Sequence, residues 1–279
     1  MRSSLRRVTG IVIGALAAVV LTFALTGCEI SDSASGTFTP AHDNVLTVVT
    51  QPFPTVGFWE GTAAHPTGGF EYEMAEELAS RLGLDGVKVE TREFSEIVAG
   101  NLGDADIAMS LLTPTSEREE NLDFTTPYLQ TTPAFLTRDG TEIPDLETAQ
   151  GMKIAVGRNT TLEGIVDDTI RPDQEPLRFE NRDREIEAVR KGTADAALFD
   201  LAAAQAIIKE SPNLTIAAQL NDPEPIAAAL PKGSSNTDAV GSALRSMEAD
   251  GTIDQLSADW LGISVSDLSA NIPLLRTNQ

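Results

Sequence analysis

The sequence predicts an α/β protein built from two units of similar size. From Val45 onward, short β-branched or apolar runs alternate with segments whose apolar residues recur at helical spacing, which is typical of a parallel sheet. The alternation restarts after Asp139-Gly140, and two further helical segments end the pattern. We therefore expect the second unit to be inserted into the first, with a cleft between two lobes, a common place for a ligand.

In the first unit, the β-branched run 45–49 is the first expected strand. Four apolar residues then recur at helical spacing between Phe70 and Leu82, and Gly83 follows as a terminator. Alternation of valine with polar residues predicts a half-buried strand at 87–90. The remaining expected elements are a weak helix at 97–102, a strand at 104–112 and an extended segment at 134–137.

In the second unit, a strand at 153–156 breaks at Gly157, and the run from Asn159 to Glu163 matches a capping box that opens a helix. An apolar run at 195–200 predicts a buried strand that leads into an Ala-rich helix at 201–209. The other expected elements are a strand at 177–179, a helix through Ile186 and Val189, an extended segment at 226–230, and helices at 237–249 and 253–261.

Composition excludes several classes of function. The 279-residue chain has 20 basic and 42 acidic residues, for a net charge of −22, so it offers no basic field for nucleic acid. Its single cysteine excludes a disulfide framework and a cysteine-rich metal site. The two histidines, His42 and His65, form no HExxH-like pattern. We therefore expect no metal and no cofactor.

The first residues are typical of a processing signal. A basic start precedes an apolar stretch at 11–25, which ends in Leu25-Thr26-Gly27-Cys28. This ending resembles the lipobox of bacterial lipoproteins, in which the chain is cut before the cysteine and the cysteine sulfur is acylated. We expect a signal peptide at 1–27, lipidation of Cys28 and a flexible tether at 28–44. The alternative is an uncleaved membrane helix at 8–25.

A turn near residue 113 has the features of an anion site. The strand expected at 104–112 ends at Thr113-Pro114, where Thr113 is a good N-cap and Pro114 suits a first helical position. A helix N-terminus presents free N–H groups to an anion, and Arg118 adds a guanidinium one turn further on. This corner is expected to hold a carboxylate. The alternative is that Arg118 is solvated beside its glutamate neighbours.

Residues 45–262 resemble the extracytoplasmic solute-binding proteins of polar-amino-acid ABC transporters, the bacterial family 3. The resemblance rests on the order of several motifs: Gly69-Phe70-Glu71, residues 107–118, Leu122-Asp123-Phe124, Asn159-Thr160-Thr161, residues 192–200 and residues 250–260. It implies a two-lobed, type II periplasmic-binding-protein-like fold with a hinge and a cleft. Lobe 1 would comprise 45–131 and a return segment at 225–262, lobe 2 would comprise 132–224, and 263–279 would be a tail.

The resemblance also implies roles for individual residues. Arg118 would pair with the α-carboxylate of an amino acid, with Thr113 and Thr161 donating to the same group, and Asp200 would take the α-ammonium. Asp200 could instead simply cap the helix that follows it. The other candidate ligand-binding residues are Gln51, Phe53, Phe58, Phe94, Ser110, Leu111 and Thr160.

Some positions depart from the family pattern. Leu111 stands where Ser or Gly is common, Glu71 replaces the usual Asp, and Asn159 replaces the usual Gly. The aromatic residue that faces the ligand would be Phe53 or Phe58, in a loop that serves either as a ligand platform or as packing. Phe94 would form the other wall.

The sequence therefore predicts a monomeric, lipid-anchored, extracytoplasmic binding protein that delivers an amino acid to an ABC permease. Hinge crossings are expected near 131–133 and 221–225. One alternative is an enzyme like the cyclohexadienyl or arogenate dehydratases, which share this architecture. The expected cleft segments contain no histidine and no second acid beside Asp200, which argues against it. Another alternative is a ligand-sensing module.

Overall fold

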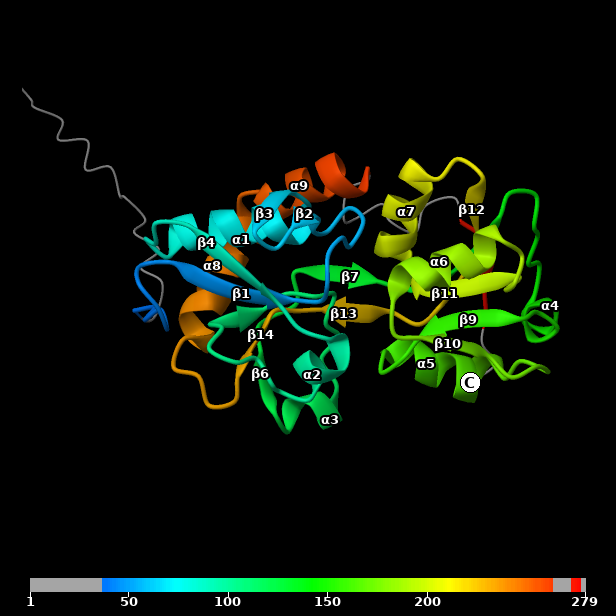
Figure 1. The fold of residues 1–279 in the computed structure, drawn as a ribbon, viewed down its shortest axis with the longest axis horizontal. Helices are drawn as coiled ribbons and strands as arrows, with labels where there is room; N and C mark the ends of the chain where they lie inside the picture. Colours follow the sequence, from blue (N-terminus) through cyan, green and yellow to red (C-terminus); the bar gives the residue numbers. More distant parts are fainter. Residues whose placement is uncertain (1–36, 263–271, 277–279) are drawn as a thin grey trace, which may run out of the picture. The chain divides into compact units, whose positions relative to one another are not determined.

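Two mixed sheets organise the part of the chain that the computed structural model describes, residues 37–262 and 272–276 (Figure 1). In the first sheet the strand order is β4(Val87–Thr91), β1(Leu46–Thr50), β5(Ile107–Ala108), β14(Ala229–Pro231) and β6(Leu122–Phe124). Strand β1 pairs in parallel with β4 and β5, whereas β14 runs antiparallel to β5 and β6. The late strand β14 therefore returns the chain to the first sheet.

Helices cover both faces of the first sheet because its strands alternate their apolar side chains between two cores. Val48 and Ile107 face the core that contains α1(Phe70–Arg81), α8(Thr237–Ala249) and α9(Thr252–Leu261). Their neighbours Val49 and Ala108 face a smaller core with α2(Phe94–Val98). The chain between β1 and β6 also contains the helix α3(Ser116–Glu119) and the hairpin of β2(Glu60–Thr62) and β3(His65–Gly68).

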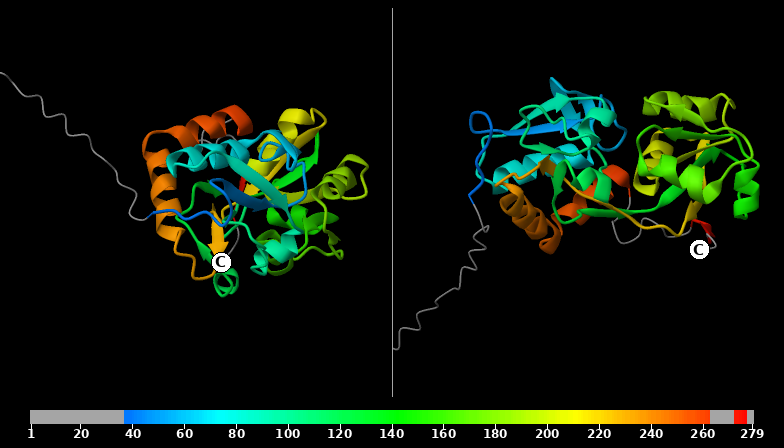
Figure 2. Two further views of the ribbon diagram at one scale, coloured as in Figure 1. Left: turned by 60° about the vertical axis from the view of Figure 1, so that its left-hand side comes forward. Right: turned by 90° about the horizontal axis from the view of Figure 1, so that it is seen from below.

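The second sheet has the order β10(Leu177–Phe179), β9(Ile154–Gly157), β11(Ala196–Asp200), β8(Pro133–Arg138), β12(Leu214–Leu220) and β15(Leu274–Leu275). Ala197 and Phe199 face α6(Arg182–Arg190) and α7(Leu201–Glu210). Ala196 and Leu198 face the opposite core, which contains α5(Thr161–Ile165) and the π-helix Val166–Ile170. Helices therefore cover both faces, as Figure 2 also shows, and α4(Leu146–Gln150) packs beside the π-helix.

The chain passes between the two sheets on a pair of short strands. Strand β7(Leu129–Thr131) leads toward β8, and β13(Glu224–Ile226) leads back toward β14. The two pair antiparallel, with Glu224 opposite Thr131. The crossings expected near 131–133 and 221–225 lie at this ribbon.

Several local predictions were wrong. The sheets are not purely parallel, because β8 runs antiparallel to both β11 and β12. Helix α3 begins at Ser116 with Thr115 as its N-cap, not at Pro114 after Thr113. Of the strand expected at 104–112, β5 comprises only Ile107–Ala108, and α2 starts earlier than 97. The prediction also missed β12, β15 and the β2–β3 hairpin.

In the described ranges, no helix is both long enough and apolar enough to cross a membrane. The signal peptide predicted at 1–27, the lipidation site Cys28 and most of the tether lie outside the described residues.

Replacement of Leu78 by alanine tests the core packing of α1. Leu78 is fully buried, so Leu78→Ala should lower the free energy of unfolding by about 2–5 kcal/mol through lost apolar burial and a residual cavity. Leu274, which is 50% exposed on β15, offers the same chemical change at the surface. Urea denaturation of both variants should show a large shift in the midpoint for Leu78→Ala alone; equal shifts would contradict this packing.

Candidate functional site

A cavity forms where the carboxyl ends of strands from both sheets face each other. Its volume, taken as the space open to the centre of a water-sized sphere, is about 50 Å³. The first sheet and its helices contribute Gln51, Phe94, Leu111, Thr113 and Arg118 to the lining. The second sheet and its helices contribute residues 157, 158, 160–162, 179, 180, 182, 185 and 198–200. Eight of the eleven candidate ligand-binding residues therefore meet in one place, namely Gln51, Phe94, Leu111, Thr113, Arg118, Thr160, Thr161 and Asp200.

Arg118 connects the two sides of the cavity. It is only 7% exposed, and its Nη1 donates to the Thr113 carbonyl at 2.8 Å. Its Nη2 donates to the Asn159 carbonyl on the opposite side at 3.0 Å. The guanidinium also lies over the Phe94 ring, with Cζ 5.5 Å from the ring centroid. Two of its five N–H donors are thus engaged, which leaves donors for a ligand carboxylate.

Two opposing effects act on the pKa of Arg118: its burial and the acidic groups near it. Removal from water lowers the pKa of Arg118, while Glu224 and Asp200 raise it. The Arg118 guanidinium is therefore a buried cation with carboxyl groups near it.

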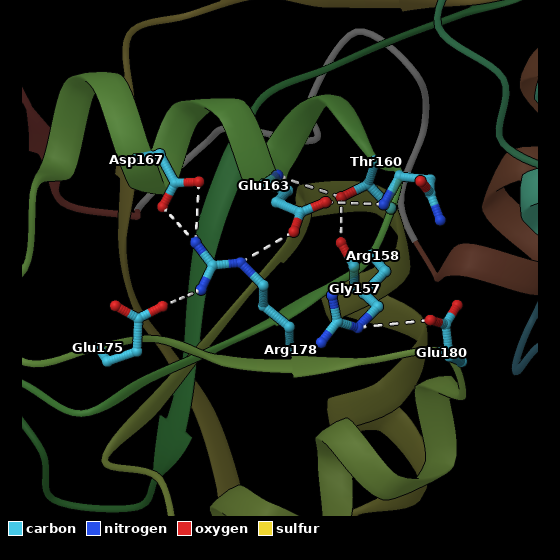
Figure 3. Close-up of polar contacts among 9 residues, drawn as sticks. Gly157, Arg158, Thr160, Glu163, Asp167, Glu175, Arg178 and Glu180 are labelled. Carbon is cyan, nitrogen blue, oxygen red and sulfur yellow. Dashed lines mark hydrogen bonds and ion pairs between the residues drawn. The ribbon is translucent and has the colours of Figure 1, made fainter.

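A second polar network holds the opposite wall in place (Figure 3). Thr160 is the N-cap of α5: its Oγ1 accepts from the Glu163 N–H at 3.2 Å and donates to the Gly157 carbonyl at 2.7 Å. The Glu163 carboxylate accepts from the Asn159 N–H at 2.8 Å and from Arg178 Nε at 2.9 Å. Arg178 also pairs with Asp167 and Glu175, so α5 is fixed to β10. The helix start expected in this run is confirmed with Thr160 as its N-cap, but the Glu163 side chain accepts from Asn159 rather than from the Thr160 N–H, so the predicted capping box is incomplete.

Backbone conformation at this wall explains one departure from the family pattern. Asn159 has φ +61, a left-handed conformation that glycine adopts freely and that asparagine tolerates better than most residues. Its carbonyl is the acceptor for Arg118, so this conformation contributes directly to the contact across the cavity.

Leu111 is held in a left-handed conformation by a buried acid. Its φ is +52, which costs roughly 1–2 kcal/mol for a residue with a side chain. The Glu71 carboxylate accepts from the Leu111 N–H at 2.8 Å, from Trp59 Nε1 at 2.6 Å and from the Tyr128 hydroxyl. Burial raises the pKa of Glu71, and these three donors oppose that rise. The glutamate therefore fixes a strained backbone that lines the cavity.

Three buried carboxyl groups besides Glu71 have raised pKa values. Burial raises the pKa of Asp200 to about 6, opposed by Arg182 and Arg118. Burial raises that of Glu185 to about 8, with repulsion from Asp200 adding to the rise and Arg182 opposing it. Burial and repulsion from Asp200 raise that of Glu224 to about 7. Although Asp200 precedes α7, its side chain makes no capping hydrogen bond, so capping does not explain it.

The prediction that no second acid lies beside Asp200 was therefore wrong. Sequence reasoning missed Glu185, Glu224 and Arg182, because charged residues in a helix and beside prolines look like solvated surface. One signal was present for Glu185: it stands four residues before the buried Val189 and next to Ile186, on the apolar side of α6.

The aromatic candidates divide between the cavity and the core. Phe94 lines the cavity, whereas Phe58 is fully buried against Phe70, with ring centroids 5.8 Å apart. Phe53 packs its edge on Trp59 and faces an adjoining hollow. Neither Phe53 nor Phe58 is part of the cavity lining, and Phe58 packs in the core. Ser110 is also buried and supports the site indirectly, because its Oγ accepts from the Gln51 N–H at 3.2 Å.

No group of three His, Cys, Asp or Glu side chains arranged for a metal ion occurs in the described part of the chain.

The chain belongs to the bacterial extracellular solute-binding proteins, family 3, whose model matches residues 46–263. It is 28% identical over 208 residues to the L-cystine-binding protein TcyJ of Escherichia coli K12, covering 71% of this chain and 76% of that protein. It is also 28% identical to the solved structure of an ancestral arginine-binding protein bound to glutamine, with a TM-score of 0.69 over 79% of this chain and 99% of that one. The type II binding-protein fold is thus confirmed.

An enzyme is also among the relatives. The chain is 30% identical over 198 residues to a membrane-bound lytic murein transglycosylase F of Saccharophagus degradans, covering 67% of this chain but only 38% of that protein.

Stability of the unliganded protein should fall as pH rises from 5 to 8. In this range folded Glu185, with a pKa of about 8 against an ordinary 4.5, keeps a proton that the unfolded chain releases. The folded state binds more protons, so raising the pH favours unfolding. Glu185→Gln should reduce the slope of Tm against pH, because an amide does not titrate.

Glu187→Gln is the matched control, since Glu187 lies on the same helix but pairs with Lys191 at the surface. Thermal unfolding at several pH values measures all three proteins, and an unchanged slope in Glu185→Gln would contradict the assigned protonation.

Proposed function

We propose that this chain is the extracytoplasmic substrate-binding lipoprotein of an ABC importer, which captures an amino acid in the cavity and delivers it to the permease. One observation carries the proposal: Arg118 and Asp200, of opposite charge, are both withdrawn from water into the same cavity. A zwitterionic amino acid offers a carboxylate to the first and an ammonium to the second.

The remaining polar groups suit the same ligand. Thr113 and Thr161 line the cavity from opposite sides and can donate to the carboxylate that Arg118 holds. The Asp200 side chain makes no capping hydrogen bond with α7, so a ligand need not displace one. An ammonium group beside Asp200 would stabilise its ionised form. Membership of a solute-binding family and resemblance to a cystine-binding relative support an amino acid as the ligand.

Ligand capture is proposed to close the two lobes, 45–131 with 225–262 and 132–224, about the β7–β13 ribbon. Arg118 already contacts the Asn159 carbonyl across the cavity. A ligand that binds between them favours the closed form in proportion to its better affinity for that form.

The proposed location follows from the leader sequence. The lipobox-like run that ends at Cys28 would place an acylated, monomeric protein outside the cytoplasm, held to the membrane by its lipid. The tether after it would let the globular part reach the permease.

A dehydratase-like enzyme is the second candidate, because Glu185 lines the cavity and, with a pKa of about 8, is suited to general acid catalysis. Incubation with prephenate or arogenate would detect this activity, and turnover would displace the transport proposal.

Arg118→Ala and Asp200→Ala should each weaken amino-acid binding by about 30-fold or more, because each leaves a buried ligand charge without its partner, a loss of about 2–5 kcal/mol. Arg245→Ala, at an exposed position on α8, is the matched control for Arg118→Ala. A thermal-shift screen of the standard amino acids identifies the ligand, and calorimetry measures the variants. Parent-like binding by both variants would refute the proposed clamp.

Cys28→Ser should release the protein from membranes, because serine offers no thiol for acylation. Cell fractionation and labelling with radioactive palmitate measure this. Retention of Cys28→Ser in the membrane fraction at the parent level would contradict the lipid anchor and favour a membrane-spanning leader.

A further inference from the structure

Glu185 is a buried acid of the cavity wall whose role the proposed carboxylate and ammonium contacts do not explain. Its side chain projects from the first turn of α6 and is 3% exposed. Its Oε2 lies against Gly157, where the Cβ of any larger residue would be 3.5 Å from it, and Thr160 borders the same glycine. Glu185 therefore faces the wall formed by the end of β9 and the start of α5.

The Glu185 carboxyl group lacks an internal partner. Within the described ranges its Oε1 is buried without a hydrogen bond, and the side chain takes part in no ion pair within 4 Å. Leaving a buried carboxyl oxygen unpaired is costly, so such groups in native proteins call for an explanation. A ligand donor in the cavity would provide that partner.

The charges around Glu185 indicate which donor suits it. On its own helix Arg182 lies near enough to lower its pKa, but that guanidinium is stacked over Phe199, 5.6 Å from the ring centroid. From β11 the Asp200 carboxylate repels it. On the facing wall, the neutral residues Gly157 and Thr160 lie nearest, and the Thr160 hydroxyl already donates to the Gly157 carbonyl. A positive group would relieve the repulsion between the two acids as well as pair with Glu185.

We propose that Glu185 receives the positively charged side chain of the bound ligand, so that the site selects cationic amino acids. This inference rests on the proposed function, in which Asp200 and Arg118 hold the α-ammonium and α-carboxylate. Glu185 then supplies the charge that distinguishes an arginine- or lysine-like ligand from a neutral ligand of the same shape.

Glu224 is the competing acid, and the structure favours Glu185. Glu224 lies on the β7–β13 ribbon and interacts with Thr161 and Arg118, and it is not part of the cavity lining. Glu185 lines the cavity together with Asp200. Since its pKa is about 8, binding of a cation should also expel the proton that Glu185 carries at neutral pH.

The test uses ligand pairs that differ in side-chain charge but hardly in shape: L-arginine with L-citrulline, and L-lysine with L-norleucine. Calorimetry at pH 7 with the parent protein should show at least one cationic member binding ten-fold or more tightly than its neutral counterpart. Glu185→Gln should reduce that ratio to near one, whereas Glu187→Gln, the surface control on the same helix, should preserve it. Measurement in two buffers of different ionisation enthalpy should show proton release by the parent that is reduced in Glu185→Gln.

Equal affinity for the charged and neutral members of both pairs would overturn the inference, as would a preference that Glu185→Gln retains. If the parent binds a neutral amino acid in a manner that requires Arg118, the proposed function stands and only the cationic selectivity fails. If no amino acid binds, the proposed function fails as well. Circular dichroism of Glu185→Gln establishes that it is folded, and its binding of the neutral ligands keeps the comparison informative.

Discussion

Charged groups withdrawn from water require partners, and this requirement governs the cavity between the two sheets. Arg118, Asp200, Glu185 and Glu224 are all largely buried. Arg118 obtains two backbone carbonyls and a ring face, while the acids respond by holding protons more tightly. The cavity thus has one cation fixed by hydrogen bonds and several acids whose charge depends on what enters. Affinity and protonation are consequently linked at this site.

The wall that contacts Arg118 depends on residues remote from the cavity. Arg178 fixes Glu163, Glu163 orders the Asn159 backbone, and the Asn159 carbonyl accepts from Arg118. On the side of the cavity formed by the first sheet, the Glu71 carboxylate accepts from the Leu111 N–H and orders the backbone there in the same way. In both places a carboxylate stabilises a left-handed backbone in a residue with a side chain. The geometry of the cavity is therefore set by buried or half-buried acids behind it, which a comparison of lining residues alone would overlook.

Sequence reasoning located most helices and the strands with strong apolar runs, because these patterns reflect burial directly. Arg118, predicted from the local sequence, and Asp200, proposed from the family resemblance, both line the cavity, and the N-cap expected in the run from Asn159 to Glu163 is Thr160. Sequence reasoning failed where tertiary context decides: the antiparallel pairing of β8, the strand β12 between β8 and β15, and α3, whose start at Ser116 depends on the Thr115 hydroxyl. Glu185 was missed for the same reason, since only the fold turns a charged helix residue toward a cavity. Phe58 is the opposite case: it was one of two aromatic residues expected to face the ligand, but it packs against Phe70 in the hydrophobic core.

Strand β15 adds a connection that the two-strand ribbon alone would not suggest. After α9 the chain reaches the second sheet once more, where Leu274 and Leu275 pair with Gln219 and Leu220 at its edge. The chain thus joins the two sheets three times. The segment from Leu261 to Leu274 can span at most about 45 Å when fully extended. The length of this third connection sets an upper limit on the distance between the end of α9 and the edge of the second sheet.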